Sequence, residues 1–258
     1  MPDRMAAVAL IAAAATSVAL FLLPLLGLLA SSPWSETATL LGEPRVRQAL
    51  LLSLGVSTGA VALSLLLGFP LAWILARREF PGRRILRTVI TLPMVMPPVV
   101  AGVALLAAFS SRGLLGPALS AFGVTIPFTT LAAVIAAAFV SAPFLITTLE
   151  AGIAQVDERL EDVARTLGAS RWLAFRSVLL PAIRPSLSAG IALCWARALG
   201  EFGATITFAG NLEGRTQTVP LAIYQILQTR PEQAFLLGAV LLLASLLVLA
   251  GLRGRLRA

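Results

Sequence analysis

Long apolar runs separated by short charged segments dominate the hydrophobic pattern of this chain. A helix needs about 20 apolar residues to cross the hydrocarbon core of a bilayer, which is about 30 Å thick. Runs of that length occur six times, at 5–30, 50–76, 88–110, 129–149, 185–209 and 234–252. The pattern therefore predicts an all-α polytopic membrane protein with six transmembrane helices, whose natural solvent is lipid.

The first run is longer than the hydrophobic part of a secretory signal. It holds about 25 apolar residues, whereas a signal peptide has about 7–15. We therefore expect it to be retained as a membrane helix. Its positive flank is weak, with Arg4 alone, so a signal peptide stays open as the other interpretation.

Composition agrees with a lipid environment and excludes two common kinds of catalytic site. The 258 residues are 58% hydrophobic and 12% charged, with a mean hydropathy of +0.92. All twenty basic residues are Arg, and there is no Lys or His. A Walker A loop needs Lys at the nucleotide phosphates, and the usual catalytic triad needs His. The chain is therefore not expected to be an enzyme, and a separate subunit must bind any ATP and Mg²⁺.

The single cysteine, Cys194, lies inside the fifth apolar run. One cysteine can form neither an intrachain disulfide nor a paired-cysteine metal site, so its expected role is packing. We expect no metal site and no cofactor bound by this chain.

The distribution of Arg predicts the orientation. With the N-terminus in the cytoplasm, the cytoplasmic segments hold fourteen Arg and the external loops five, and Arg197 lies within the fifth run. This excess follows the positive-inside rule and predicts that both termini are cytoplasmic. Topology and attraction to anionic lipid headgroups then explain the net charge of +8, so no nucleic acid partner is expected.

Two segments differ from simple connections or simple spans. The external segment 31–49 contains Pro33 and Trp34 and predicts a short interfacial helix or a contact with an external partner. The segment 91–102 contains Pro93, Pro97 and Pro98, which disfavour a continuous helix. Broken backbone at membrane depth either lines a water-filled pathway or forms a kinked packing element.

The cytoplasmic loop 150–184 has helical periodicity. Leu160, Val163, Ala164 and Leu167 recur at the spacing of one helix face. Gly168 follows them, where a turn with positive φ ends a helix. Ser170 is placed to cap a second helix that runs through Trp172, Phe175 and Val178 towards Pro181. The loop therefore predicts a helix, a tight turn and a second helix, which either lies on the membrane surface or docks a partner.

The spacing in this loop matches a known motif. The motif is Glu-Ala-Ala, three residues, Gly, nine residues, then Ile, one residue and Leu-Pro. This chain has Asp162, Val163 and Ala164, then Gly168, and ends with Val178 and Leu180-Pro181 at the same spacing. Asp for Glu and Val for Ala are departures within the first turn. The chain thus resembles the permease subunits of binding-protein-dependent ABC importers.

The resemblance implies a type I ABC importer permease fold and a role for the loop. In that family the loop is a coupling helix that seats in a groove of the ATPase. The whole chain, 1–258, would be one transmembrane permease domain with a core at about 45–250. The implied docking surface is formed by Leu160, Asp162, Val163, Ala164, Leu167, Gly168, Ala169 and Pro181.

The fifth run contains two charges deep in a predicted span. Arg197 and Glu201 are four residues apart, so on one helix they would share a face and neutralise each other. Intramembrane charges also commonly face a polar path, which makes these two residues candidates for lining a translocation pathway. The remaining candidates are Pro97, Pro98, Thr205 and Thr207. Gly200 and Gly203 would instead permit close helix packing.

The sequence of residues 200–211, GEFGATITFAGN, and of the loop that follows is similar to that of the molybdate/tungstate importer permeases. Sulfate/thiosulfate permeases have a similar stretch and remain the alternative. The resemblance implies a homodimer in the inner membrane, two ATPase subunits on the cytoplasmic side and an extracytoplasmic oxyanion-binding protein. An ATP-independent secondary transporter would need membrane-embedded acidic residues besides Glu201, and the spans hold none.

Overall fold

The computed structural model describes residues 2–254, and every regular element within them is a helix. In chain order these are α1 Pro2–Ala30, η1 Trp34–Glu36, α2 Thr37–Gly42, α3 Pro44–Arg77, α4 Arg83–Val95, α5 Pro98–Phe109, α6 Gly116–Ala121, α7 Thr130–Ala154, α8 Glu158–Thr166, α9 Arg171–Ala174, η2 Phe175–Leu179, α10 Leu180–Ala182, α11 Arg184–Leu199, α12 Gly203–Phe208, α13 Val219–Leu227 and α14 Pro231–Gly254. The all-α prediction is confirmed for the described residues.

Four helices are long and apolar enough to cross a membrane. They cover Ala6–Ala30, Pro44–Arg77, Thr130–Ala154 and Pro231–Val248, and they correspond to the first, second, fourth and sixth predicted runs. A fifth candidate joins Arg171–Ala182 to Arg184–Leu199 through a bend of 69°. By length and composition, the described residues therefore support four or five spans. The other two predicted runs are each divided between two shorter helices.

The run 88–110 is interrupted where its proline pair begins. Helix α4 ends at Val95, and Met96 and Pro97 are extended, with ψ of 134° and 132°, before α5 starts at Pro98. A proline disfavours helical backbone in the residue before it, so the break falls just ahead of Pro97 and Pro98. The predicted break is confirmed, while Pro93 lies inside α4 without ending it.

The prediction of one helix across 185–209 is wrong. Helix α11 ends at Leu199, three residues follow, and α12 begins at Gly203. Glu201 therefore lies beyond the end of α11 rather than on its face. The residues on both sides of the break are mostly apolar, so an apolar run alone does not reveal where the backbone leaves the helix.

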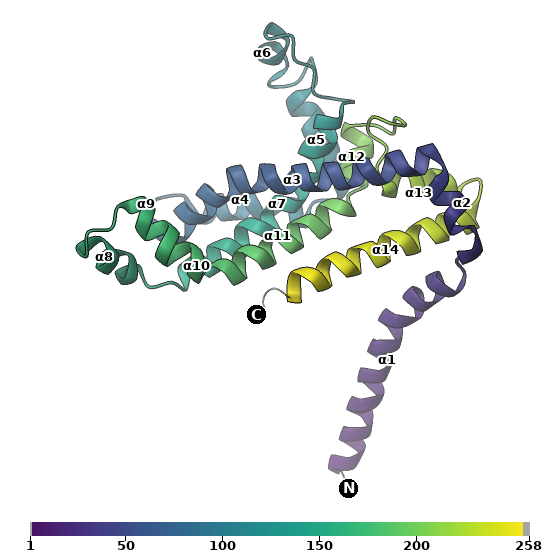
Figure 1. The fold of residues 1–258 in the computed structure, drawn as a ribbon, viewed down its shortest axis with the longest axis horizontal. Helices are drawn as coiled ribbons and strands as arrows, with labels where there is room; N and C mark the ends of the chain where they lie inside the picture. The colour runs from purple at the N-terminus through teal and green to yellow at the C-terminus, as the bar shows by residue number, and fades with distance from the viewer. Residues whose placement is uncertain (1, 255–258) are drawn as a thin grey trace.

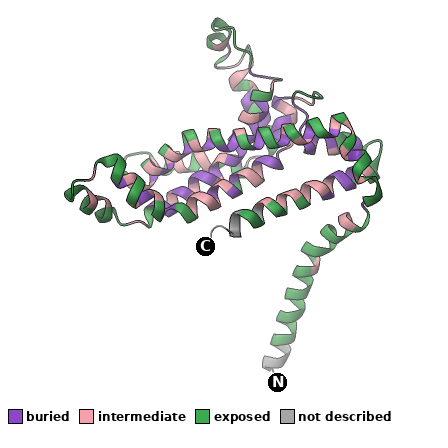
Figure 2. Cartoon of the chain, viewed as in Figure 1, coloured by how far each residue is buried: buried purple, intermediate pink, exposed green. Residues whose placement is uncertain are grey.

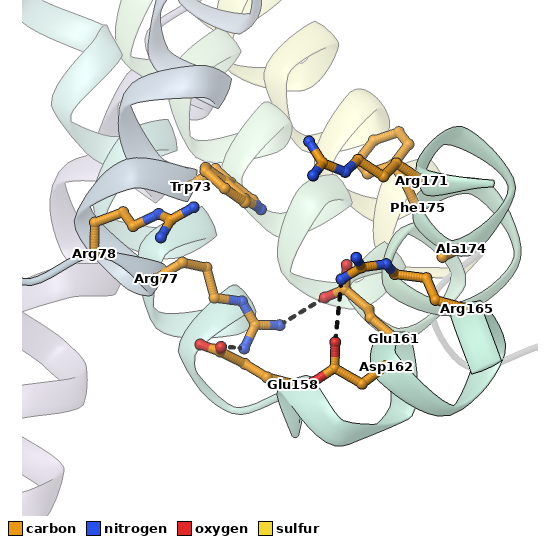
Figure 3. Close-up of a pocket in the computed structure, with 10 residues that line it drawn as sticks. All are labelled: Trp73, Arg77, Arg78, Glu158, Glu161, Asp162, Arg165, Arg171, Ala174 and Phe175. Carbon is orange, nitrogen blue, oxygen red and sulfur yellow. Dashed lines mark hydrogen bonds and ion pairs between the residues drawn. The ribbon is translucent and has the colours of Figure 1, made fainter. Parts of the chain in front are cut away.

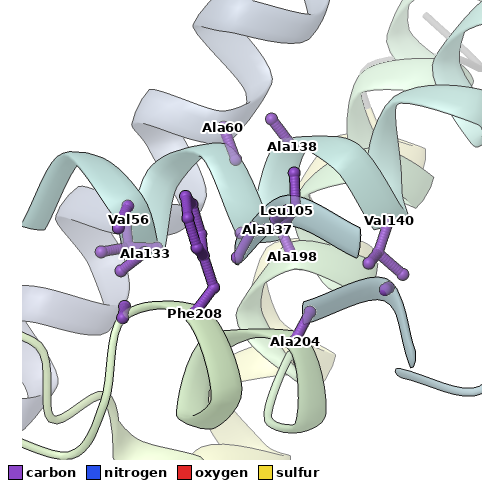
Figure 4. Packing of buried hydrophobic residues seen from close by; sticks show 14 of the residues in the cluster. Val56, Ala60, Leu105, Ala133, Ala137, Ala138, Val140, Ala198, Ala204 and Phe208 are labelled. Atoms are coloured by element: carbon purple, nitrogen blue, oxygen red, sulfur yellow. The ribbon is translucent and has the colours of Figure 1, made fainter. Parts of the chain in front are cut away.

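Helices α3, α7 and α11 pack together as the centre of the fold (Figure 1). Alanines on α7 are fully buried, among them Ala132, Ala133, Ala136 and Ala137. Small side chains let helix backbones approach closely, and in lipid this close packing replaces the hydrophobic drive that is available in water. Phe208 of α12 is fully buried and points into this alanine-rich cluster (Figure 4).

Helix α1 and the α5–α6 segment extend from this centre. Figure 1 shows α1 leading away from the other helices, and its side chains are mostly exposed along the length described (Figure 2). Helix α14 packs against α13 and α11. Since α1 carries apolar side chains outside the packed bundle, lipid or another chain must cover them in a membrane.

The 31–49 segment and the 150–184 loop lie at opposite ends of α3 (Figure 1). The first contains η1 and α2, so the predicted short helix is present, and Trp34 Nε1 donates a hydrogen bond to the Leu29 carbonyl at 2.8 Å. The loop 150–184 contains the predicted pair of helices. This separation is what a membrane-spanning α3 requires.

Candidate functional site

The first helix of the 150–184 loop, α8, begins with a side-chain cap. The carboxylate of Asp157 accepts a hydrogen bond from the backbone N–H of Arg159 at 2.9 Å. Glu158 and Glu161 lie in the first turn and Arg165 in the last, where these charges complement the helix dipole. The sequence thus sets both the start and the polarity of α8.

The turn after α8 has the geometry of a Schellman motif. The N–H of Ala169 donates to the Ala164 carbonyl at 3.0 Å, and the N–H of Gly168 donates to the Arg165 carbonyl at 3.0 Å. Gly168 has a φ of +93°, a conformation that costs a residue with a Cβ about 1–2 kcal/mol. The predicted positive-φ turn at Gly168 is therefore confirmed.

The second helix is anchored to α3 by aromatic packing. Ser170 Oγ caps α9 by accepting a hydrogen bond from the N–H of Leu173 at 3.2 Å, as predicted. The ring of Phe175 stacks on Trp172 at 5.4 Å and meets Phe69 of α3 edge-on at 5.9 Å. Between Phe175 and Leu179 the helix widens into a π-helix, η2, which the sequence analysis did not predict.

An apolar face of α8 is left uncovered by the other described residues. No residue of α8 is buried, and the side chains that repeat at helical spacing are exposed: Leu160 at 54%, Val163 at 55% and Leu167 at 83%. Asp162 is also exposed, while Ala164 and Ala169 are half-buried. These residues and Gly168 lie together in α8 and the turn that follows it. Pro181 is instead exposed in α10, at the far end of the second helix.

A buried arginine ties α8 to the end of α3, and the sequence analysis did not identify it. The side chain of Arg77 is 7% exposed and lies 3.3 Å from Glu158 and 3.1 Å from Glu161 (Figure 3). Its guanidinium also donates to the Val156 carbonyl at 2.8 Å. Arg77, Glu158 and Glu161 line a pocket of about 400 Å³ between α3 and the loop.

Glu201 closes the break between α11 and α12. It is 2% exposed, and its Oε2 lies 2.7 Å from Nη1 of Arg197. Its Oε1 accepts a hydrogen bond from the N–H of Ala204 at 2.8 Å, in the first turn of α12. The predicted ion pair is present, and the same carboxylate also caps the start of α12.

The two divided apolar runs, 88–110 and 185–209, meet close to their breaks. A Cβ at Gly203 would lie 2.6 Å from the Pro98 Cβ, and one at Gly102 would lie 2.5 Å from the Thr207 Cβ. Gly203 therefore permits close packing, as predicted, whereas Gly200 has only the Ala196 carbonyl nearby, at 3.8 Å.

The other candidates for a pathway differ in exposure. Pro97 and Pro98 are exposed in the single chain, and Arg197 and Thr207 are half-buried. Thr205 is buried on the inner side of α12, at 1% exposure. Of the two threonines, Thr207 is therefore the one beside the α5–α12 contact, and its hydroxyl donates to the Gly203 carbonyl at 2.9 Å.

Residues 68–257 match the family described as binding-protein-dependent transport system inner membrane component. The match covers well over half of the chain. The chain belongs to this family. The permease is accordingly a multi-pass inner-membrane protein, which agrees with its long apolar helices.

Two relatives indicate the kind of permease. The chain is 47% identical over 183 residues to the molybdenum transport system permease protein ModB of Escherichia coli K12, covering 70% of the permease and 80% of ModB. It is 38% identical over 234 residues to the sulfate transport system permease protein CysT of the same organism, covering 89% of the permease and 84% of CysT. Both relatives are transport system permease proteins by name.

The fold agrees with these relatives. A chain in the crystal structure of a bacterial ABC transporter that imports the acidic polysaccharide alginate superposes with a TM-score of 0.72. The superposition covers 96% of the permease and 94% of that chain, at 21% sequence identity. At this identity the likeness shows the fold alone, which is that of an ABC importer permease.

Proposed function

We propose that the permease is the membrane-spanning subunit of an ATP-driven importer of molybdate and tungstate. A second copy completes the transmembrane part, two ATPase subunits bind the α8–α9 hairpin, and an extracytoplasmic binding protein delivers the oxyanion. ATP and Mg²⁺ are bound by the ATPase subunits, because this chain has no Lys for a P-loop. The chain itself binds no cofactor, and residues 1–258 act as one permease domain.

The exposed apolar face of α8 is the observation that carries this proposal. A short helix with Leu160, Val163 and Leu167 uncovered needs a partner or lipid to cover them. The Schellman turn and the contact of Phe175 with Phe69 hold the hairpin in a defined position. A rigid hairpin of this kind is able to transmit a movement of an ATPase as a rigid body.

In the membrane, the permease crosses six times with both termini in the cytoplasm. The third crossing consists of α4 and α5, and the fifth of α11 and α12, each interrupted near its middle or end. The excess of Arg on the side of the 150–184 loop supports this orientation.

The oxyanion moves along the α5–α12 side of the subunit. Pro97, Pro98 and Thr207 lie where the two broken spans meet, and Arg197 and Glu201 lie at the second break. Thr205 supports α12 from its buried face. A tetrahedral dianion is costly to move through hydrocarbon, so it needs a hydrated path of this kind that opens to one side at a time.

The substrate assignment follows the sequence similarity. ModB is 47% identical to the permease and CysT 38% identical, and this difference favours molybdate and tungstate over sulfate. A sulfate importer is the second candidate because the CysT similarity extends over 89% of the chain.

ATP hydrolysis by the permease–ATPase complex in lipid vesicles tests the proposal. The binding protein is loaded in turn with molybdate, tungstate or sulfate. Stimulation by molybdate and tungstate alone is the expected result. Stimulation chiefly by sulfate would support the importer function but reject molybdate and tungstate as its substrates. The absence of any ATPase that binds the permease would reject the importer function.

A further inference from the structure

We propose that Arg77 is the positioning residue that makes the coupling hairpin move together with α3, an inference that rests on the proposed importer function. Arg77 is the last residue of α3, and its partners are on α8 and in the turn before it. It thereby joins the helix that faces the ATPase to one of the central helices of the bundle.

The contacts of Arg77 form a three-point attachment, of which Figure 3 shows the two carboxylate partners, Glu158 and Glu161. Nη1 donates to the Val156 carbonyl at 2.8 Å and lies 3.3 Å from Glu158 Oε1, while Nη2 donates to Glu161 Oε1 at 3.1 Å. The Arg77 side chain is 7% exposed and that of Glu161 24% exposed, so solvent screens their pair less than it screens a surface pair. Glu158, at 65% exposed, is the outer member.

The attachment needs the shape of arginine as well as its charge. Glu158 and Glu161 are three residues apart on one helix face and repel each other without a cation between them. A guanidinium presents five donors in a planar fork and can reach both carboxylates and a carbonyl at once, whereas an ammonium acts as a point charge.

Helix α8 has little other attachment to α3. None of its residues is buried, and the apolar face that would otherwise pack is the exposed one. Phe175 attaches the second helix of the hairpin to α3 through Phe69, and α8 packs against that second helix, whereas the Arg77 contacts join α8 to α3 directly. A helix attached by ion pairs follows its partner only while those pairs persist.

The same end of α3 is linked onward into the membrane part. The Leu75 carbonyl accepts hydrogen bonds from Arg83 and Arg87 of α4, and Arg87 Nε donates to Glu150 of α7 at 2.6 Å. Helix α4 leads directly to the break before Pro97. A displacement of α8 that reaches α3 through Arg77 is therefore passed to α4 and α7.

The test compares Arg77→Gln with Arg78→Gln in the complete complex. Arg78 is the next residue, is exposed, and forms no ion pair among the residues whose side chains are described; its guanidinium lies 5.8 Å from the centre of the Trp73 ring. Arg78→Gln therefore controls for loss of one positive charge at this end of α3. Vesicles with wild-type permease, ATPase and molybdate-loaded binding protein are measured first for uptake and hydrolysis. We expect Arg77→Gln to assemble and hydrolyse ATP but to transport about fivefold less molybdate per ATP, while Arg78→Gln stays at the wild-type ratio.

Two further measurements separate positioning from general stability. Hydrogen exchange at residues 158–167 in the complex should be faster in Arg77→Gln than in Arg78→Gln. Glu158→Gln with Glu161→Gln should lower the transport ratio as Arg77→Gln does, and adding Arg77→Gln to that pair should lower it little further, since the changes remove one shared interaction. Arg77→Lys should restore only part of the wild-type amount of molybdate transported per ATP.

Each outcome bears on one of the two proposals. Wild-type vesicles without stimulated hydrolysis would reject the importer function whatever Arg77 does. A normal wild-type result with equal transport ratios for Arg77→Gln and Arg78→Gln would reject the role of Arg77. Should the Arg77→Gln complex fail to assemble, the single variants Glu158→Gln and Glu161→Gln are measured instead. If both transport as much molybdate per ATP as the wild type, the role of Arg77 is rejected.

Discussion

Gly203 of α12 lies so close to Pro98 of α5 that a Cβ added at position 203 would lie 2.6 Å from the Pro98 Cβ and 3.2 Å from the Pro98 carbonyl carbon. The second neighbour is backbone, so it cannot rotate away. Two interrupted apolar runs are thus joined at the first residues of α5 and α12. The contact explains why a residue without a side chain is needed in the first turn of α12.

Replacing Gly203 with Val should separate α5 from α12. Overpacking of this kind costs about 1–3 kcal/mol, so the thermal midpoint of the purified permease should fall. Gly200→Ala is the matched control because Gly200 is exposed and its nearest neighbour is 3.8 Å away. Equal midpoints for the two variants would show that the α5–α12 contact is looser than the structure indicates.

Replacing Gly168 with Val should disrupt the turn after α8. A β-branched residue at a φ of +93° is strained by about 1–2 kcal/mol, and the exposed helix can relieve that strain by unwinding. Recovery of the ATPase with tagged permease should therefore fall. Gly168→Asn is the control, since Asn tolerates this conformation better, and equal recovery with both variants would contradict the docking role of the turn.

Replacing Leu167 with Ser should weaken ATPase binding without unfolding the permease. Leu167 is 83% exposed, so its loss removes little packing within the chain, whereas an apolar contact at an interface is worth about 1 kcal/mol or more. We expect the dissociation constant of the ATPase to rise about fivefold or more. Leu114→Ser, at a residue 86% exposed in the α5–α6 segment, should leave it unchanged. An effect of equal size at Leu114 would point to a general loss of solubility.

Replacing Arg197 with Met should destabilise the permease more than replacing both members of the pair. The single change leaves the carboxylate of Glu201 buried without its cation, at a cost of about 3–5 kcal/mol. Arg197→Met with Glu201→Gln removes both charges, and the glutamine can still accept the hydrogen bond from Ala204. A double-mutant cycle of unfolding midpoints checks this, and additive effects would mean that the two residues do not depend on each other.

Local patterns in the sequence determined much of this protein. Apolar runs predicted the spans at α1, α3, α7 and α14, because length and hydropathy act within one segment. Gly168 and Ser170 predicted the turn and the second helix of the hairpin, since caps depend on residues a few positions apart. The proline pair predicted the break before α5.

Only the tertiary structure decided the features that join distant segments. Arg77 meets Glu161 across 84 positions, and nothing in the local pattern of either residue selects the other. The end of α11 at Leu199 was hidden in an apolar run, because what stabilises the interruption is the cap from Glu201 and the fit of Gly203 against Pro98. Periodicity and hydropathy report how one segment meets its surroundings, whereas these contacts depend on which segments become neighbours when the chain folds.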